Sequence, residues 1–148
     1  MAWWNSIFGN KDEEFSALQE NTREEFAGLN FKTAMESHLR WKLRLKSVID
    51  GTSTETLDPA VVASDNQCVL GKWIDSEGTR QFGAYPGFKK VVTAHTHFHK
   101  CAGHTLDLAM NGKINEADAE LISGDFARAS LDVSRHLMRL WREVGIDK

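Results

Sequence analysis

The sequence predicts an all-α fold, a four-helix bundle in which one helix is short, broken or partly replaced by a loop. Only two of the 148 residues are proline, so few positions interrupt a helix. Apolar residues recur three and four positions apart along three segments, which is the spacing of a single helix face. No segment has a clear strand pattern, so these amphipathic segments are expected to pack against one another.

Residues 1–29 are expected to form a unit of their own, ahead of a helical domain at 30–148. Residues 1–10 contain an apolar cluster of Trp3, Trp4, Ile7 and Phe8. This cluster suits a terminal turn folded back on the domain, a partner-binding tag or a weak membrane-surface anchor. Residues 11–29 are acidic and polar with a thin apolar line, which predicts a helix of modest amphipathicity.

A stronger helix follows, and Asp50-Gly51 supplies its stop because glycine suits a left-handed cap. Its apolar face consists of Phe31, Ala34, His38, Trp41, Leu45 and Val48. The connection after it is rich in turn-forming residues. Asp58-Pro59 is expected to open a short helix through Val62 or Ala63, with proline in the first helical position. The segment CVLGKWIDSEG, from Cys68, is expected to form another short helix or a structured turn.

The second half of the chain predicts two long helices. The first follows Pro86 and ends near Asn111-Gly112, with Phe88, Val92, His95, His99, Ala102, Leu106 and Ala109 on one face. The last is expected to begin near Asn115, which would cap it with Asp118 three residues on. Its apolar face is Ala119, Ile122, Phe126, Ala129, Val133, Leu137, Leu140 and Val144.

Composition excludes several classes of protein. Eighteen Lys and Arg residues face 21 Asp and Glu residues, for a formal charge of −3, so the chain has no general attraction for nucleic acid. The N-terminus lacks the basic and long apolar regions of a signal peptide, and no 18 apolar residues run together. Two cysteines are too few for a secreted disulfide scaffold. The expected location is the cytoplasm.

Histidine positions suggest a metal site. His95 and His99 are four residues apart on one helix, so both rings lie on the same side, one turn apart. His38 lies on the apolar face of the earlier helix. Each histidine taken alone suits a hydrogen-bonded core residue, but three that face one core favour ligation. Cys68 heads a short segment that can present a thiolate, and three imidazoles with one thiolate form a closed tetrahedral set that suits Zn²⁺.

These residues resemble one family. His38 ahead of Trp41, the segment Cys68-Val69-Leu70-Gly71-Lys72-Trp73, and the pair His95 and His99 resemble the pattern of the chemoreceptor zinc-binding (CZB) domain. Their order and their long intervals both fit, and the resemblance covers roughly Phe31 to Met110.

The resemblance implies a four-helix bacterial cytoplasmic domain, usually homodimeric, that binds zinc through His38, Cys68, His95 and His99. Such domains are typically attached to chemoreceptors or diguanylate cyclases, where they sense zinc or oxidants that attack the metal-bound cysteine. The sequence contains no cyclase motif and no long receptor coiled coil, so we expect a stand-alone regulator or a fragment, with a receptor or cyclase as a possible partner.

Other interpretations are weaker. Zinc could serve only as a structural staple of an interaction module. A metalloenzyme is disfavoured, because Thr96 stands where H-E-x-x-H has its glutamate and four protein ligands close the coordination sphere. A di-iron carrier is disfavoured, because no acidic residue stands four positions after His38, His99, His104 or His136. The chain is therefore not expected to be an enzyme.

Two further groups of side chains have simpler interpretations. His97, Cys101 and His104 form a second line on their helix, which suits a solvated or interface face better than a second metal site. Arg128, Arg135, Arg139 and Arg142 form a basic strip on the last helix, expected to be solvated but able to meet an acidic partner.

Overall fold

The computed structural model of the chain describes residues 25–26 and 29–146. The expected apolar cluster at residues 1–10 lies outside this part, as does most of the expected acidic helix. Where that helix should end, the described residues form a small antiparallel ribbon instead. Strand β1 (Glu25–Phe26) pairs with β2 (Leu29–Asn30), with Phe26 opposite Leu29. The helix prediction was therefore wrong at this end, and the side chain of Leu29 is fully buried in the bundle.

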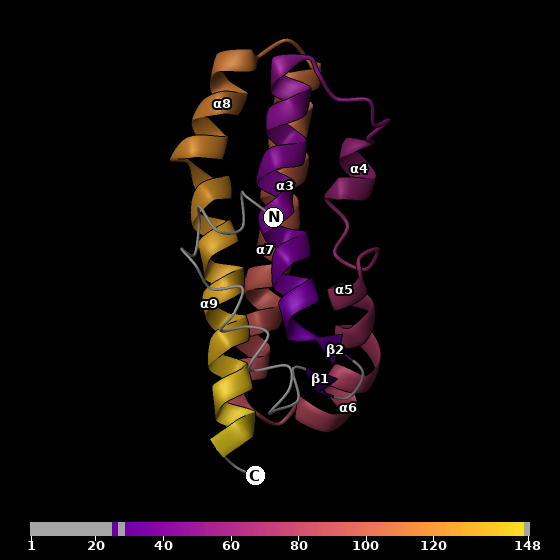
Figure 1. Ribbon diagram of the computed structural model, residues 1–148, viewed down its shortest axis with the longest axis vertical. Helices are drawn as coiled ribbons and strands as arrows, with labels where there is room; N and C mark the ends of the chain where they lie inside the picture. Colours follow the sequence, from indigo (N-terminus) through magenta and orange to yellow (C-terminus); the bar gives the residue numbers. More distant parts are fainter. Residues whose placement is uncertain (1–24, 27–28, 147–148) are drawn as a thin grey trace.

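The rest of the chain is a four-helix bundle with one broken helix, as predicted (Figure 1). Helix α3 (Phe31–Asp50) runs along the bundle from the end near β2. Short elements return along it: α4 (Pro59–Val62), α5 (Val69–Trp73), the π-helical turn η1 (Ile74–Gly78) and α6 (Thr79–Phe82). Helix α7 (Pro86–Met110) runs up again, and α8 (Ile114–Ile122) and α9 (Asp125–Ile146) run down.

Local sequence explains both ends of α3. The side chain of Asn30 caps its start by accepting a hydrogen bond from the backbone N–H of Thr33, at 2.8 Å. Gly51 ends it in the left-handed conformation, with φ of 77°, and donates its backbone N–H to the carbonyls of Ser47 and Val48. The predicted stop at Asp50-Gly51 is thus confirmed.

Helix α7 is the central element, because it packs against α3, α4, α8 and α9. Its buried face includes Phe88, His95, His99, Ala102 and Leu106, as the periodicity predicted. The prediction of the short helix α4 is also confirmed, with Asp58 accepting a hydrogen bond from the N–H of Ala60 and proline in its first turn.

The last predicted helix is two helices. It begins at Ile114 rather than at an Asn115 cap, and it breaks at Ser123 and Gly124 before α9. Glycine is a poor helix former, and the buried positions step by five residues across the break, from Leu121 to Phe126. Ala119 and Ile122, predicted to be in the core, are therefore exposed, whereas the predicted core residues from Phe126 to Val144 are buried.

Within the described residues, no helix is at once long enough and apolar enough to cross a lipid bilayer.

Candidate metal centre

Four potential ligands from three separate segments meet inside the bundle. His38 comes from α3, Cys68 stands immediately before α5, and His95 and His99 come from α7. Their ligand atoms all lie within 4.8 Å of one another, and in the described part of the chain they are the one group of three or more His, Cys, Asp or Glu residues so arranged. The structure thus brings together all four side chains singled out in the sequence.

The distances among these atoms fit one small cation at their centre. The Sγ atom of Cys68 lies 3.8, 3.2 and 3.6 Å from the Nε2 atoms of His38, His95 and His99. The Nε2 atoms of His95 and His99 are 3.0 Å apart. A tetrahedral zinc ion with ordinary bond lengths would place its ligands about 3.3 to 3.6 Å apart, which is close to these values.

Backbone carbonyls orient two of the three imidazole rings. Nδ1 of His38 lies 2.7 Å from the carbonyl oxygen of Ala34, and Nδ1 of His99 lies 2.9 Å from that of Val62. A carbonyl oxygen can only accept, so each Nδ1 carries the proton and donates it. Each Nε2 therefore turns a lone pair toward the cluster, which is the arrangement usual for metal-bound histidines.

Burial keeps these histidines neutral. Their exposed fractions are 2%, 1% and 3% for His38, His95 and His99. Desolvation by burial lowers the pKa of His38 to about 4 and that of His95 to about 3, and it also lowers the pKa of His99. At neutral pH all three rings therefore have a lone pair to offer a cation without first losing a proton.

Cys68 is held differently. It is half-buried, and its Sγ accepts a hydrogen bond from the backbone N–H of Gly71, at 3.3 Å. Burial raises the pKa of the thiol, an effect opposed by the backbone N–H groups of Gly71 and Leu70. The thiolate thus needs a nearby positive charge, and the donor set fits a borderline-soft divalent cation such as zinc.

Close backbone packing sets the position of Cys68. A Cβ atom on Gly71 would lie 1.8 Å from the carbonyl oxygen of Asp65, so only glycine allows this approach. The carboxylate of Asp65 accepts a hydrogen bond from the hydroxyl of Thr96, at 2.5 Å, which ties the loop before Cys68 to α7 between the two histidine ligands.

Phe98 is a site residue that the sequence did not single out. Its ring centroid lies 5.2 Å from that of His38 and 5.3 Å from that of His99, and its side chain is fully buried. It forms an apolar wall beside the cluster. Only its position next to His99 in the sequence could have suggested this.

The second histidine group makes no comparable site. His97 and His104 are exposed, whereas Cys101 is buried with its Sγ 3.5 Å from Nε2 of His97.

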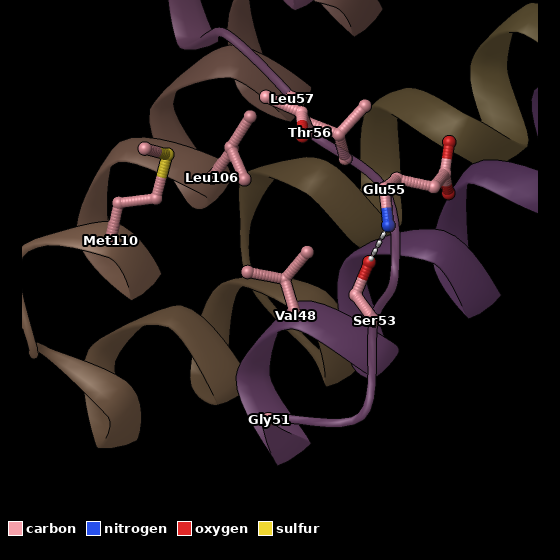
Figure 2. Close-up of a pocket in the computed structure, with 8 residues that line it drawn as sticks. All are labelled: Val48, Gly51, Ser53, Glu55, Thr56, Leu57, Leu106 and Met110. Atoms are coloured by element: carbon pink, nitrogen blue, oxygen red, sulfur yellow. Dashed lines mark hydrogen bonds between the residues drawn. The ribbon is translucent and has the colours of Figure 1, made fainter.

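A pocket of about 340 Å³ near the C-terminal end of α3 is separate from the four clustered ligands (Figure 2). It is lined by Val48 and Leu106 among others, and Val48 stands ten residues, roughly 15 Å of helix, beyond His38.

Comparisons with known proteins agree with this geometry. Residues 38–106 match the family model described as chemoreceptor zinc-binding domain, and the matched segment contains all four clustered side chains. Neither the search of curated proteins nor the search of solved structures returned a match. The resemblance noted in the sequence is therefore confirmed over residues 38–106, which match the model of the chemoreceptor zinc-binding domain family.

Proposed function

We propose that His38, Cys68, His95 and His99 bind one Zn²⁺ ion, and that the chain is a sensory or regulatory domain that responds to zinc or to oxidation of Cys68. The observation that supports this most is the convergence of three neutral, buried imidazoles and one thiol within 4.8 Å, from three segments of the bundle. A hydrophobic core would not gather four such groups without a shared partner, because buried polar groups are costly when unsatisfied.

Zinc at this site would link α3, α5 and α7. One thiolate reduces the formal charge of the ion to about +1, and the bound sulfur would release its proton on binding. Structural zinc can contribute on the order of 10 kcal/mol to folding. Loss of one ligand would therefore change the relative stability of helix arrangements by several kcal/mol, which is enough to shift a two-state equilibrium.

Oxidation of Cys68 offers a second signal. A peroxide would transfer one oxygen atom to the thiolate, giving sulfenate at the sulfur and water as the reduced product. The oxidised sulfur is a weaker ligand, so the ion would bind less tightly. Cys68 is half-buried, unlike the fully buried histidines, which leaves its sulfur the most accessible of the four ligand groups.

The metal site also bears on where the domain works in the cell and with which partners. We infer that the domain works in the cytoplasm, because zinc binding requires a reduced Cys68 and the cytoplasm keeps thiols reduced. The domain would act as a homodimer in chemotaxis or cyclic-di-GMP type signalling. Its partner would be a chemoreceptor or a diguanylate cyclase. Catalysis is not part of it, because four protein ligands leave zinc no open position for substrate.

A purely structural zinc site is the alternative, favoured by the nearly complete burial of the three histidines. Titration with buffered zinc separates the two proposals. For a sensor, the oligomeric state or the amide hydrogen exchange of α3 and α7 changes within the free-zinc range of a cell, or on peroxide treatment. A bundle that stays unchanged across that range and after oxidation of Cys68 would leave zinc as a staple only.

A further inference from the structure

The groove between α7 and α9 gathers positive charge that the metal site does not use. Two adjoining pockets, of about 460 and 470 Å³, share Lys90 and His136 in their linings. The first also contains Arg139 and Arg142, and the second contains Lys89. We call these four Lys and Arg residues, together with His136, the cationic groove. It lies on the side of α7 that carries His97, whereas the neighbouring His95 is buried among the clustered ligands.

Within the described part of the chain, the lysines and arginines of this groove lack the ion pairs that other basic residues of the bundle make. Arg128 and Arg135 each pair with the aspartate three residues before them in α9, at 2.5 and 3.1 Å. Within residues 25–26 and 29–146, neither Arg139 nor Arg142 makes an ion pair, and Lys89 and Lys90 make none either. Among the residues that the structure describes, a chain with a formal charge of −3 thus presents four cations without an ion pair along one groove.

Two carboxylates also line the groove, and each already has a partner within the bundle. Asp132 is paired with Arg135, at 3.1 Å. Glu143 accepts a hydrogen bond from the backbone N–H of Gly87, at 3.2 Å, in the first turn of α7. The pKa of His136 is lowered, first by burial and then by Arg139, whereas Asp132 opposes the shift and Lys90 and Arg135 add to it, which disfavours the charged form of this ring.

We propose that the cationic groove binds an acidic segment of a partner protein. The groove extends along α7 from Gly87 to His97, ten residues or about 15 Å, which matches about five residues of an extended chain. Its cations are long, exposed and spread along both helices, so they suit several carboxylates in a row.

A compact phosphate group fits this groove less well. Phosphate sites commonly use the free N–H groups at the start of a helix. In α7, the N–H of Gly87 already donates to the carboxylate of Glu143, so a carboxylate occupies the position that a phosphate would take. None of the residues that line the groove is one of the four clustered ligands, so failure of this proposal and failure of the metal proposal are separate outcomes.

The test uses the full chain with zinc present and a fluorescein-labelled hexaglutamate peptide, followed by fluorescence anisotropy. We expect Lys90→Gln with Arg139→Gln to weaken binding at least tenfold. The matched control is Arg80→Gln with Arg128→Gln, which removes the same charge from residues already paired with Glu77 and Asp125. The control should change binding less than twofold. Lys89→Gln with Arg142→Gln serves as a second groove pair if the first fails to fold.

Four results would overturn the proposal. One is absence of peptide binding by the unaltered chain at 50 mM salt. Another is an equal loss in the groove and control variants, which would show only a general charge effect. A third is displacement of the peptide by hexathymidylate at a lower concentration than by unlabelled hexaglutamate, which would assign the groove to phosphate polyanions. The fourth is a changed oligomeric state of the same variants in sedimentation, which would make a second copy of this chain the occupant.

Discussion

The Sγ atom of Cys68 lies 3.2 Å from Nε2 of His95, although 27 residues separate the two along the chain. Cys68 stands directly before α5, whereas His95 belongs to the long helix α7. A bond from both atoms to one ion would therefore fasten the broken second helix of the bundle to its central helix. Such a link would make the position of the loop before α5 depend on whether the ion is bound.

Replacing Cys68 by alanine should reduce zinc affinity at least a hundredfold. Loss of a residue that only orients a ligand typically costs 10- to 100-fold, so loss of the ligand itself should cost more. Competition with a chromogenic chelator measures the affinity, and elemental analysis should find about one zinc per unaltered chain. Cys101→Ala is the matched control and should retain affinity. Full occupancy of Cys68→Ala against the chelator would remove this sulfur from the site.

Zinc binding should release about one proton per ion at pH 7. Because burial holds the pKa of His38 at about 4 and that of His95 at about 3, the histidines have no proton to lose, whereas the thiol of Cys68, with its raised pKa, has one. The logarithm of the affinity should thus rise about one unit per pH unit from pH 5 to 7. Calorimetry in buffers of different ionisation enthalpy counts the protons. A steeper slope below pH 6.5 would show histidines that titrate normally.

Gly71→Ala should destabilise the protein by about 1 to 3 kcal/mol, since its Cβ would overlap the carbonyl oxygen of Asp65. The loop would move, so zinc affinity should fall as well. Denaturant unfolding and chelator competition measure the two effects. Gly145→Ala in α9 is the control, because a Cβ there meets nothing within 4 Å. Equal stability of the two variants would mean that the loop yields without cost.

Thr96→Val should lower stability by about 1 kcal/mol by removing the hydrogen bond to the half-buried Asp65 carboxylate. Thr96 touches the loop rather than a ligand, so zinc affinity should fall less than tenfold. The matched control is Thr93→Val, which makes the same change of side chain, and so of helix propensity, at an exposed position of the same helix. If both variants bound zinc and unfolded alike, the bond between Thr96 and Asp65 would not position Cys68.

The sequence by itself determined the helical class, the limits of α3 and α7 and the four residues of the cluster. Helical periodicity and helix caps are local properties, so a few turns of sequence are enough to identify them. The same reasoning failed where local signals were weak. It extended a helix through Glu25–Phe26 and Leu29, and it carried the last helix across Gly124, because an apolar pattern can continue across a break.

Only the tertiary structure decided how the cluster is held and which charges remain unpaired. The carbonyls that orient His38 and His99 come from α3 itself and from the end of α4, and the contact of Asp65 with Gly71 depends on a loop fold without a periodic signal. The cationic groove exists because α7 and α9 pack side by side. Spacing along a chain specifies the face of a helix, but distances between faces follow from packing, which no single segment encodes.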